Sequence, residues 1–264
     1  MSRLKTPRTF LIGSTMPDFS GMYAYLTYTN QLEYMREFER GCEELGPITL
    51  ASFYAKLCYE SLVVGRNSNI TRVRDTRSNL ESCYDHKHGS VLEHITFNFV
   101  TTDCSRILTH ELVRHRVGIA YSQTSGRYVA LDDISVVLPP EFQDAYLNDP
   151  EVQYAIDVFL INTENLAEML RAKMIPDGAS FEFKKKMTSA IRRFAPNGQT
   201  NQIGWTPNIR TLRHIINMRT SRHAEWEIRY VFAEVAQIIL DKHPMALYGY
   251  TVEDVDGLPE YTVQ

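Results

Sequence analysis

The chain has few cysteines, and their spacing gives no metal or redox motif. Among its 264 residues there are four cysteines, and no pair forms Cys-x-x-Cys, which argues against a zinc ribbon or a thioredoxin-like site. No Gly-x-Gly-x-x-Gly follows a strand-like segment, which argues against a Rossmann nucleotide site. No apolar run approaches 18 residues, and the first residues lack the apolar core of a secretory signal. We therefore expect a cytoplasmic protein that neither spans nor binds a membrane.

An excess of positive charge is also lacking. The formal net charge is -4, whereas nucleic-acid-binding domains are usually basic, so no nucleic-acid partner is expected. Arginine is nevertheless concentrated in two segments, 114–127 and 192–222. Guanidinium groups gathered in an acidic protein are typical of a site for a compact anion such as phosphate.

Strand-like segments lie in the first half of the chain. Segments 7–13, 94–100 and 134–138 predict strands, and in the second of these Ile95, Phe97 and Phe99 share one face. Helical spacing predicts two helices within 28–62, separated at Gly46-Pro47, and another over 69–84. Asp103 is expected to cap a helix that runs to Arg116.

Helical patterns dominate the second half. Four helices are expected there: from Asp149-Pro150 to about Met174, from Ser180 to before Pro196, from Thr206-Pro207 onward, and from Ser221 to Lys242. The predicted fold class is α+β, a single domain over residues 1–264 with a mixed or antiparallel sheet and a largely helical C-terminal half.

The densest group of chemically active residues is His110–Arg116. Its two histidines are five residues apart, about 140° out of line on a helix, whereas zinc proteases place theirs four apart. We therefore predict no metal site. Two arginines and a histidine at the end of this helix form donors suited to phosphate or a ring carbonyl.

A second arginine group surrounds the helix expected at Thr206-Pro207. Arg210 lies in its first turn, where an arginine opposes the helix dipole unless an anion binds there too. Arg219 shares a face with Ile215 and Ile216, so we expect a buried stem and a guanidinium group that enters the active cleft.

Three separated blocks of the sequence combine these residues. They are the segment HGSVLEH at 88–94, Arg114-His115-Arg116 followed by Ser125-Gly126-Arg127-Tyr128, and Asn208-Ile209-Arg210 with His214, Arg219 and the segment AEWE at 224–227. In this order the blocks resemble the flavin-dependent thymidylate synthases, over about residues 50 to 245. One more residue separates Arg116 from Ser125 than in the family pattern, so the match is anchored at the Ser-Gly-Arg-Tyr run.

The resemblance implies a homotetramer that binds FAD where subunits meet. Its reaction would methylate dUMP at uracil C5, with 5,10-methylenetetrahydrofolate as carbon donor and NADPH as the reductant of the flavin. It implies that FAD is held by Ser90, Arg114, His115, Arg116, Gln123, Asn208, Arg210 and His214, with His88 near the flavin ring. It implies that dUMP is held by Glu111, Arg114, Gln123, Thr124, Ser125, Gly126, Arg127, Arg192 and Arg219. Arg219 would be catalytic, since it would face the uracil ring and favour ionisation at N3.

Two alternatives stay open. Similar proteins in nucleoside-antibiotic pathways accept UMP, and the extra residue within 117–124 bears on that choice. A non-catalytic nucleotide- or RNA-binding module could use the same arginines, although RNA binding favours exposed aromatic platforms on a strand face.

Overall fold

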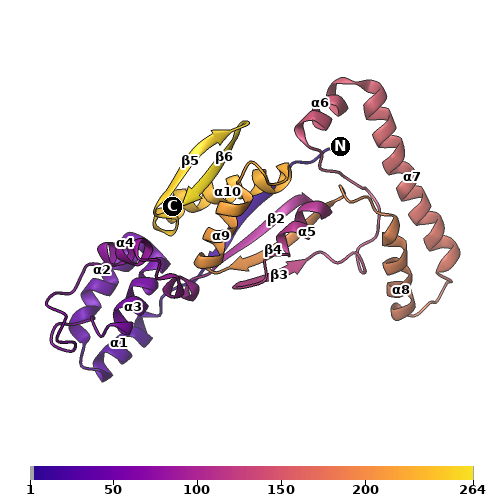
Figure 1. Ribbon diagram of the computed structural model, residues 1–264. Helices are drawn as coiled ribbons and strands as arrows, with labels where there is room; N and C mark the ends of the chain where they lie inside the picture. Colours follow the sequence, from indigo (N-terminus) through magenta and orange to yellow (C-terminus); the bar gives the residue numbers. More distant parts are fainter. Residues whose placement is uncertain (1–2, 264) are drawn as a thin grey trace.

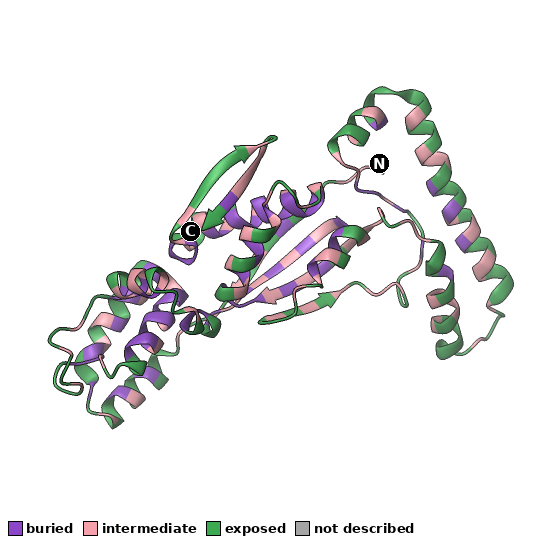
Figure 2. Cartoon of the chain, in the orientation of Figure 1, coloured by how far each residue is buried: buried purple, intermediate pink, exposed green. Residues whose placement is uncertain are grey.

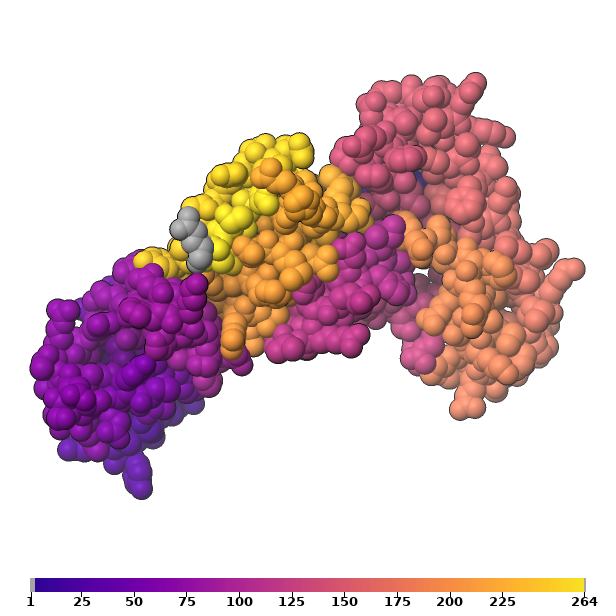
Figure 3. Space-filling model, in the orientation of Figure 1, coloured from indigo at the N-terminus to yellow at the C-terminus, as the bar shows by residue number. Residues whose placement is uncertain are grey.

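The computed structural model describes residues 3–263, which form three parts in a row (Figure 1). Helices α1–α4 lie at one end, a sheet covered by α9 and α10 lies in the middle, and helices α6–α8 form an arm at the other end. The space-filling view shows the arm standing away from the middle part (Figure 3). The predicted α+β class is confirmed.

The central sheet is antiparallel and has the strand order β1-β2-β4-β3. Its strands are Arg8–Ser14 (β1), Phe97–Ser105 (β2), Ile119–Gln123 (β3) and Thr200–Pro207 (β4). Phe99 lies opposite Trp205 in the ladder, and their rings stack at 4.5 Å between centroids. The strands expected at 7–13 and 94–100 are therefore confirmed, with the second shifted toward its C-terminal side.

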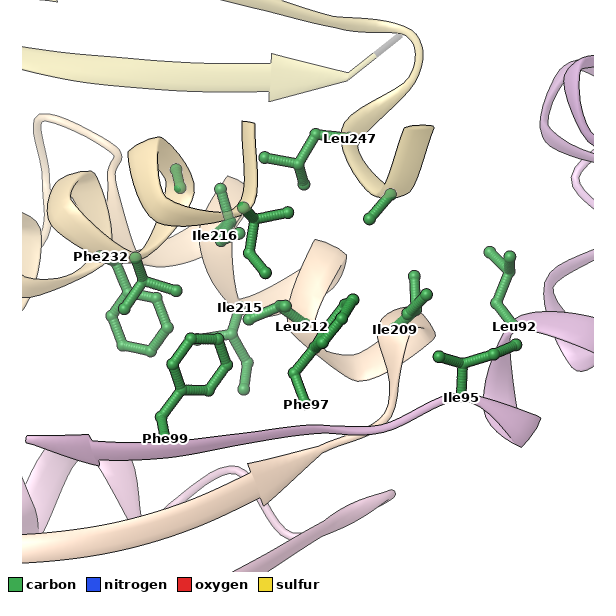
Figure 4. Close-up of a cluster of buried hydrophobic side chains, with 14 of the residues drawn as sticks. Leu92, Ile95, Phe97, Phe99, Ile209, Leu212, Ile215, Ile216, Phe232 and Leu247 are labelled. Atoms are coloured by element: carbon green, nitrogen blue, oxygen red, sulfur yellow. The ribbon is translucent and has the colours of Figure 1, made fainter. Parts of the chain in front are cut away.

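Helices α9 (Ile209–Arg219) and α10 (Trp226–Lys242) cover one face of this sheet. Phe97 and Phe99 project from β2 into this layer, where Ile215 and Phe232 meet them, and all four are at most 1% exposed (Figure 4). Burying a side chain of this size contributes roughly 1.5–3 kcal/mol. Because Phe97 and Phe99 are core residues, they offer no platform for an RNA base.

The opposite face of the sheet is open. Phe10, Val100, Gly204 and Ser122 follow one another across the four strands, and Phe10 and Ser122 are exposed. One face of an antiparallel sheet commonly meets water, but an exposed phenylalanine there is also typical of a contact surface.

The N-terminal helices enclose a second apolar cluster. They are α1 (Phe19–Tyr28), α2 (Met35–Leu45), α3 (Thr49–Cys58) and α4 (Thr76–Asp85). The two helices predicted within 28–62 are confirmed as α2 and α3; α2 ends at Gly46, whose φ of 60° is in the left-handed region. The sequence reading did not include α1. Leu26, Tyr34, Phe38 and Phe53 form the centre of this cluster.

The arm consists of α6 (Pro140–Asn148), α7 (Pro150–Met174) and α8 (Phe181–Ile191). Asp149 accepts from Glu151 N, and Ser180 accepts from Phe183 N, so both predicted helix starts are confirmed. Much of the arm's surface is exposed (Figure 2), including large apolar side chains at Phe142, Leu147, Tyr154, Phe159, Met174 and Phe181. Among residues 3–263, no helix is long and apolar enough to cross a bilayer.

The chain ends in a hairpin of β5 (Tyr250–Val255) and β6 (Leu258–Val263), which the sequence reading did not include. Short 3-10 segments complete the described elements, at Leu32–Tyr34, Gly46–Ile48, Gly89–His94, Arg192–Phe194 and Pro244–Leu247.

Several expected boundaries were wrong. The helix expected over 69–84 begins at Thr76, the one expected to run to Arg116 ends at Leu112, and the one expected from Ser221 begins at Trp226. Asp103 does not cap a helix: it has a φ of 52° at an irregularity in β2, and the strand continues to Ser105, which caps α5 (Arg106–Leu112). Segment 134–138 makes only isolated bridges, at Val136, instead of a strand. Thr206 and Pro207 end β4, so α9 begins at Ile209 and not at Pro207, and Asn208 is its N-cap.

Candidate active site

Helix α9 presents its N-terminus and one side to a groove. The Asn208 side chain accepts from Thr211 N at 2.8 Å, and Ile209 N donates to Ile95 O. Among residues 3–263, the backbone N–H of Arg210 has no hydrogen-bond partner, so it is available to a ligand. The Arg210 side chain pairs with Glu93 at 2.5 Å, and both groups are about half exposed.

The groove has a volume of about 620 Å³ and gathers most of the residues predicted to hold flavin. Of that set, its walls contain Arg114, His115, Arg116, Asn208, Arg210 and His214. Arg219, predicted to act on uracil, lies in the same groove. Four arginines line a groove that also contains the N-terminus of this eleven-residue helix, and together they make a strongly anion-attracting surface.

Arg219 is held in place from two sides. Its Nη1 donates to Glu111 Oε2 at 2.8 Å, and its Nε donates to His115 Nε2 at 3.0 Å. The side chain of Arg219 is 19% exposed and that of Glu111 is 27% exposed. Among residues 3–263, Arg219 Nη2 has no hydrogen-bond partner, so one edge of the guanidinium remains for a ligand.

His115 is the acceptor in this arrangement and must therefore be neutral at Nε2. Burial, followed by the charge of Arg219, lowers the pKa of His115 to about 4. His214 lies nearby, with 6.3 Å between ring centroids. A neutral His115 at pH 7 orients Arg219 without adding a second positive charge beside it.

The residues predicted to hold the nucleotide do not all meet in one place. Thr124, Gly126 and Arg192 line a separate cavity of about 330 Å³, called the Arg192 cavity below, whereas Arg114 lines the groove and Glu111 binds Arg219 of the groove. The Gly126 backbone lies against the Arg192 side chain. Helix α5 contributes to both places, since Arg106 and His110 line the cavity while Glu111 binds Arg219.

Besides Glu111, which reaches the groove through Arg219, five predicted residues line neither the groove nor this cavity. Ser90 is exposed in the 3-10 segment 89–94, and His88 just before it lines a different cavity near α4. Gln123 donates to Thr109 Oγ1 at 3.0 Å. Ser125 and Arg127 follow in a turn in which Ser125 is partly buried and Arg127 is exposed.

Several lining residues were missed by the sequence reading. Glu93, Val117, Thr211 and Met218 also line the groove, and the residues that also line the Arg192 cavity include Arg106 and His110. Glu93 lies inside the segment HGSVLEH at 88–94, and its place in that segment is the one sequence signal for it. The pairing of Glu93 with Arg210, 117 residues away, has no local sequence signal.

The segment with the extra residue is fastened to the start of α9. Gly118 O accepts from Asn208 N at 2.8 Å, and Thr211 Oγ1 donates to Val117 O at 2.7 Å. Gly118 has a φ of 67°, and a Cβ there would collide with the side chains of Asn208 and Thr211. The segment is thus a strand, β3, preceded by a glycine turn, where only a loop had been expected.

We expect Gly118→Ala to destabilise the fold by about 2–4 kcal/mol, because left-handed strain and loss of the Asn208 cap act together. Gly178→Ala is the matched control: its φ is 76° and nothing lies within 4 Å of the added Cβ. That control should cost only about 1–2 kcal/mol. Urea unfolding of both variants checks this, and equal losses would contradict the close packing at Gly118.

Glu227 is a buried carboxylate that supports α5 from α10. It is 3% exposed and accepts from Ser105 N at 2.7 Å and from Ser105 Oγ. Burial raises the pKa of Glu227 to about 7, with smaller contributions from Glu225 and Glu111. Because Ser105 caps α5, Glu227 fixes the start of the helix that carries Glu111.

The raised pKa of Glu227 predicts the direction in which stability changes with pH. Its contribution to stability is fully present below the ordinary value of 4.5 and is lost as pH rises through about 7. Over this pH range the free energy of unfolding of Glu227→Gln should therefore fall less than that of the parent, by on the order of 2 kcal/mol. Urea unfolding from pH 4.5 to 8 measures it, with Glu253→Gln on the exposed hairpin as control. Parallel curves for parent and Glu227→Gln would contradict it.

No group of three His, Cys, Asp or Glu side chains with metal-binding geometry occurs within residues 3–263. The four cysteines are free.

Comparison with known proteins identifies the family of this chain. The family described as thymidylate synthase complementing protein matches residues 43–245. A flavin-dependent thymidylate synthase of Mycolicibacterium gilvum (strain PYR-GCK) is 34% identical over 211 residues, covering 78% of this chain and 81% of that protein. One of Mycobacteroides abscessus (strain ATCC 19977) is 36% identical over 77% of this chain and 79% of its own. One of Clostridium tetani (strain Massachusetts / E88) is 32% identical, covering 72% and 76%. The chain therefore belongs to the family of flavin-dependent thymidylate synthases.

Proposed function

We propose that this protein methylates dUMP at uracil C5 to give dTMP. Enzymes of its class use FAD, with NADPH and 5,10-methylenetetrahydrofolate as co-substrates. The observation that carries the proposal is the groove along α9, where Arg219 lies beside six residues predicted to hold flavin. Because these substrates belong to the cytoplasmic nucleotide and folate pools, we also propose the cytoplasm as its location.

The groove fits the diphosphate of FAD. The side chains of Arg114, Arg116 and Arg210 supply positive charge, and the N-terminus of α9 supplies a free backbone N–H. Gly89, next to Ser90, lies against the Arg210 side chain, which brings the 89–94 segment to the rim of the groove. When bound, FAD supplies the hydride chemistry that no side chain can perform.

Arg219 is proposed to activate the uracil ring. C5 of uracil is a weak nucleophile, and its attack on a one-carbon unit requires negative charge to build up on N3 and the ring oxygens. The free Nη2 edge of Arg219 can stabilise that charge, while Glu111 and His115 keep the guanidinium from turning. Ser125 has no acid–base partner among the described residues and is proposed to donate to the nucleotide phosphate instead.

We further propose a homotetramer with shared active sites. On one chain, the nucleotide-binding set is divided between the groove and the Arg192 cavity. A second copy that brought its Arg192 cavity to the groove of the first would complete the set. The open sheet face at Phe10 and the exposed apolar side chains of α7 and α8 provide surface for such contacts.

The substrate is tested by comparing dUMP with UMP as acceptors in steady-state turnover of the flavin-loaded protein. We expect dUMP to give the higher kcat/KM. Equal or faster methylation of UMP would contradict the proposal and favour the nucleoside-antibiotic alternative. If the purified protein is colourless and takes up no flavin on reconstitution, flavin-dependent methylation of either nucleotide is contradicted, and a non-catalytic binding module is favoured.

A further inference from the structure

A second positively charged cavity lies among the N-terminal helices. It has a volume of about 330 Å³ and is formed by the end of α3, the 59–74 connection and the last turns of α4. The cationic or potentially cationic side chains that line it are Lys56, Arg72, Arg74, His86 and His88, and the lining contains no carboxylate. A cavity of this size is within the range of small-molecule sites.

The arginines of this cavity are largely free to bind a ligand. Arg72 is exposed and, among residues 3–263, has no hydrogen-bond or ion-pair partner, while Arg74 donates only to Ser82 Oγ at 2.9 Å. The carboxylate of the neighbouring Asp75 is engaged elsewhere, since it caps α4 through Ser78 N and Ser78 Oγ. The two arginines are therefore not paired with a carboxylate of the cavity lining.

Lys56 adds a buried positive charge. The residue is 1% exposed, and its ammonium lies 4.8 Å from the ring centroid of Tyr34 without a hydrogen-bond partner. Burial lowers the pKa of Lys56 to about 8, so most molecules carry this charge at pH 7. The carboxylates of Glu37 and Asp75 compensate this charge in part, and an anion bound in the cavity would compensate it further.

Aromatic and polar groups accompany the charges. The rings of Tyr59 and His88 have centroids 6.3 Å apart, and those of His86 and His88 are 6.1 Å apart. Asn79 and Ser61 also line the cavity. Arginines with exposed rings suit a phosphate attached to a nucleoside, because the arginines bind the phosphate in a two-pronged manner while a base stacks on the rings.

The cavity and the groove are neighbours along the chain. His88 lines the cavity, and the next residue, Gly89, lies against Arg210 of the groove. Glu93, at the other end of the same short segment, pairs with Arg210. A long cosubstrate could therefore place one end in the groove and the other in the cavity, on either side of segment 88–93.

We propose that this cavity binds the adenosine 2′-phosphate end of the reduced nicotinamide cosubstrate. A phosphomonoester carries a charge of about -1.5 to -2 at pH 7, which matches Arg72 and Arg74, and an arginine is the usual partner of a 2′-phosphate. The assignment rests on the proposed function. The assignment explains why Arg72 and Arg74 both line a cavity that contains no carboxylate. A cosubstrate without the 2′-phosphate would not need these two arginines.

The test is isothermal titration of the flavin-loaded protein with adenosine 2′,5′-bisphosphate, a probe that needs no turnover. We expect it to bind at least tenfold more tightly than adenosine 5′-monophosphate, and Arg72→Ala with Arg74→Ala to remove about 10- to 100-fold of its affinity. Arg77→Ala, an exposed arginine of the same region outside the cavity, should bind it as the parent does. Thermal unfolding checks that each variant is folded, and Arg72→Ala alone, which breaks no contact, should lose about tenfold.

Two results would overturn the assignment. One is unchanged affinity in the Arg72 and Arg74 variants. The other is inorganic phosphate binding as tightly as the nucleotide, which would make this a simple phosphate site. A second readout is anaerobic flavin reduction at 450 nm, where the variants should weaken NADPH binding and leave NADH unaffected. If the nucleotide titration succeeds while dUMP is not methylated, the proposed function fails and the nucleotide site stands.

Discussion

Arg219→Ala is expected to lower dUMP turnover by about 10²- to 10³-fold while FAD stays bound. The side chain is not among the buried core residues: its guanidinium donates to Glu111 and His115, and among the described residues its Nη2 has no hydrogen-bond partner. Its removal therefore takes away charge stabilisation during the reaction and leaves the packing of α9 intact. Steady-state turnover, with flavin absorbance measured on the same sample, checks the prediction.

The lysine variant sharpens this test. Arg219→Lys should recover little activity, because an ammonium cannot donate to Glu111, His115 and uracil in one plane. Arg222→Ala is the control: Arg222 is 49% exposed and pairs with Glu260 of the hairpin, so we expect turnover like the parent's. If Arg219→Ala or Arg219→Lys works within about threefold of the parent, a change under about 1 kcal/mol, the residue is structural.

Arg210→Ala is expected to weaken FAD binding by about 10- to 100-fold, the usual effect of losing a charge-assisted hydrogen bond. The flavin-free protein should unfold at nearly the same temperature as the parent. The Glu93 pair is exposed, and an arginine in the first turn opposes the helix dipole, so little stability depends on it.

Fluorescence titration of flavin-free protein with FAD measures the affinity, and differential scanning calorimetry measures the stability. Arg36→Ala on α2, exposed and remote from the groove, should change neither. Parent-like affinity in Arg210→Ala would remove this residue from the flavin site. A large loss of stability would show that the Glu93 pair is structural.

Local chemistry made part of the fold predictable. The alternation of Ile95, Phe97 and Phe99 identified the core face of β2, and Asp149 and Ser180 identified helix starts, because each signal acts over a few residues. The prediction for Asp103 was wrong because it used the same kind of local signal. It has the chemistry of a cap, but an irregularity in the β2–β4 pairing places it in the left-handed region and transfers the capping role to Ser105.

The sequence predicted which residues belong to the site, but it did not predict which of them contact one another. Motifs placed Arg219 and Glu111 in the same reaction, but the contact between them joins residues 108 positions apart and is made by tertiary packing. The same limit concealed Arg72 and Arg74, which stand in an irregular segment and become a charged cavity only when α3 and α4 pack around it.

The central claim is that one protein couples reduced flavin to the methylation of dUMP. The most direct measurement mixes anaerobically reduced, flavin-loaded protein with dUMP and 5,10-methylenetetrahydrofolate and follows flavin oxidation at 450 nm together with dTMP. We predict one dTMP for each flavin oxidised, and no oxidation when dUMP is left out. Formation of dTMP without flavin oxidation, or flavin oxidation without dTMP, would contradict the account.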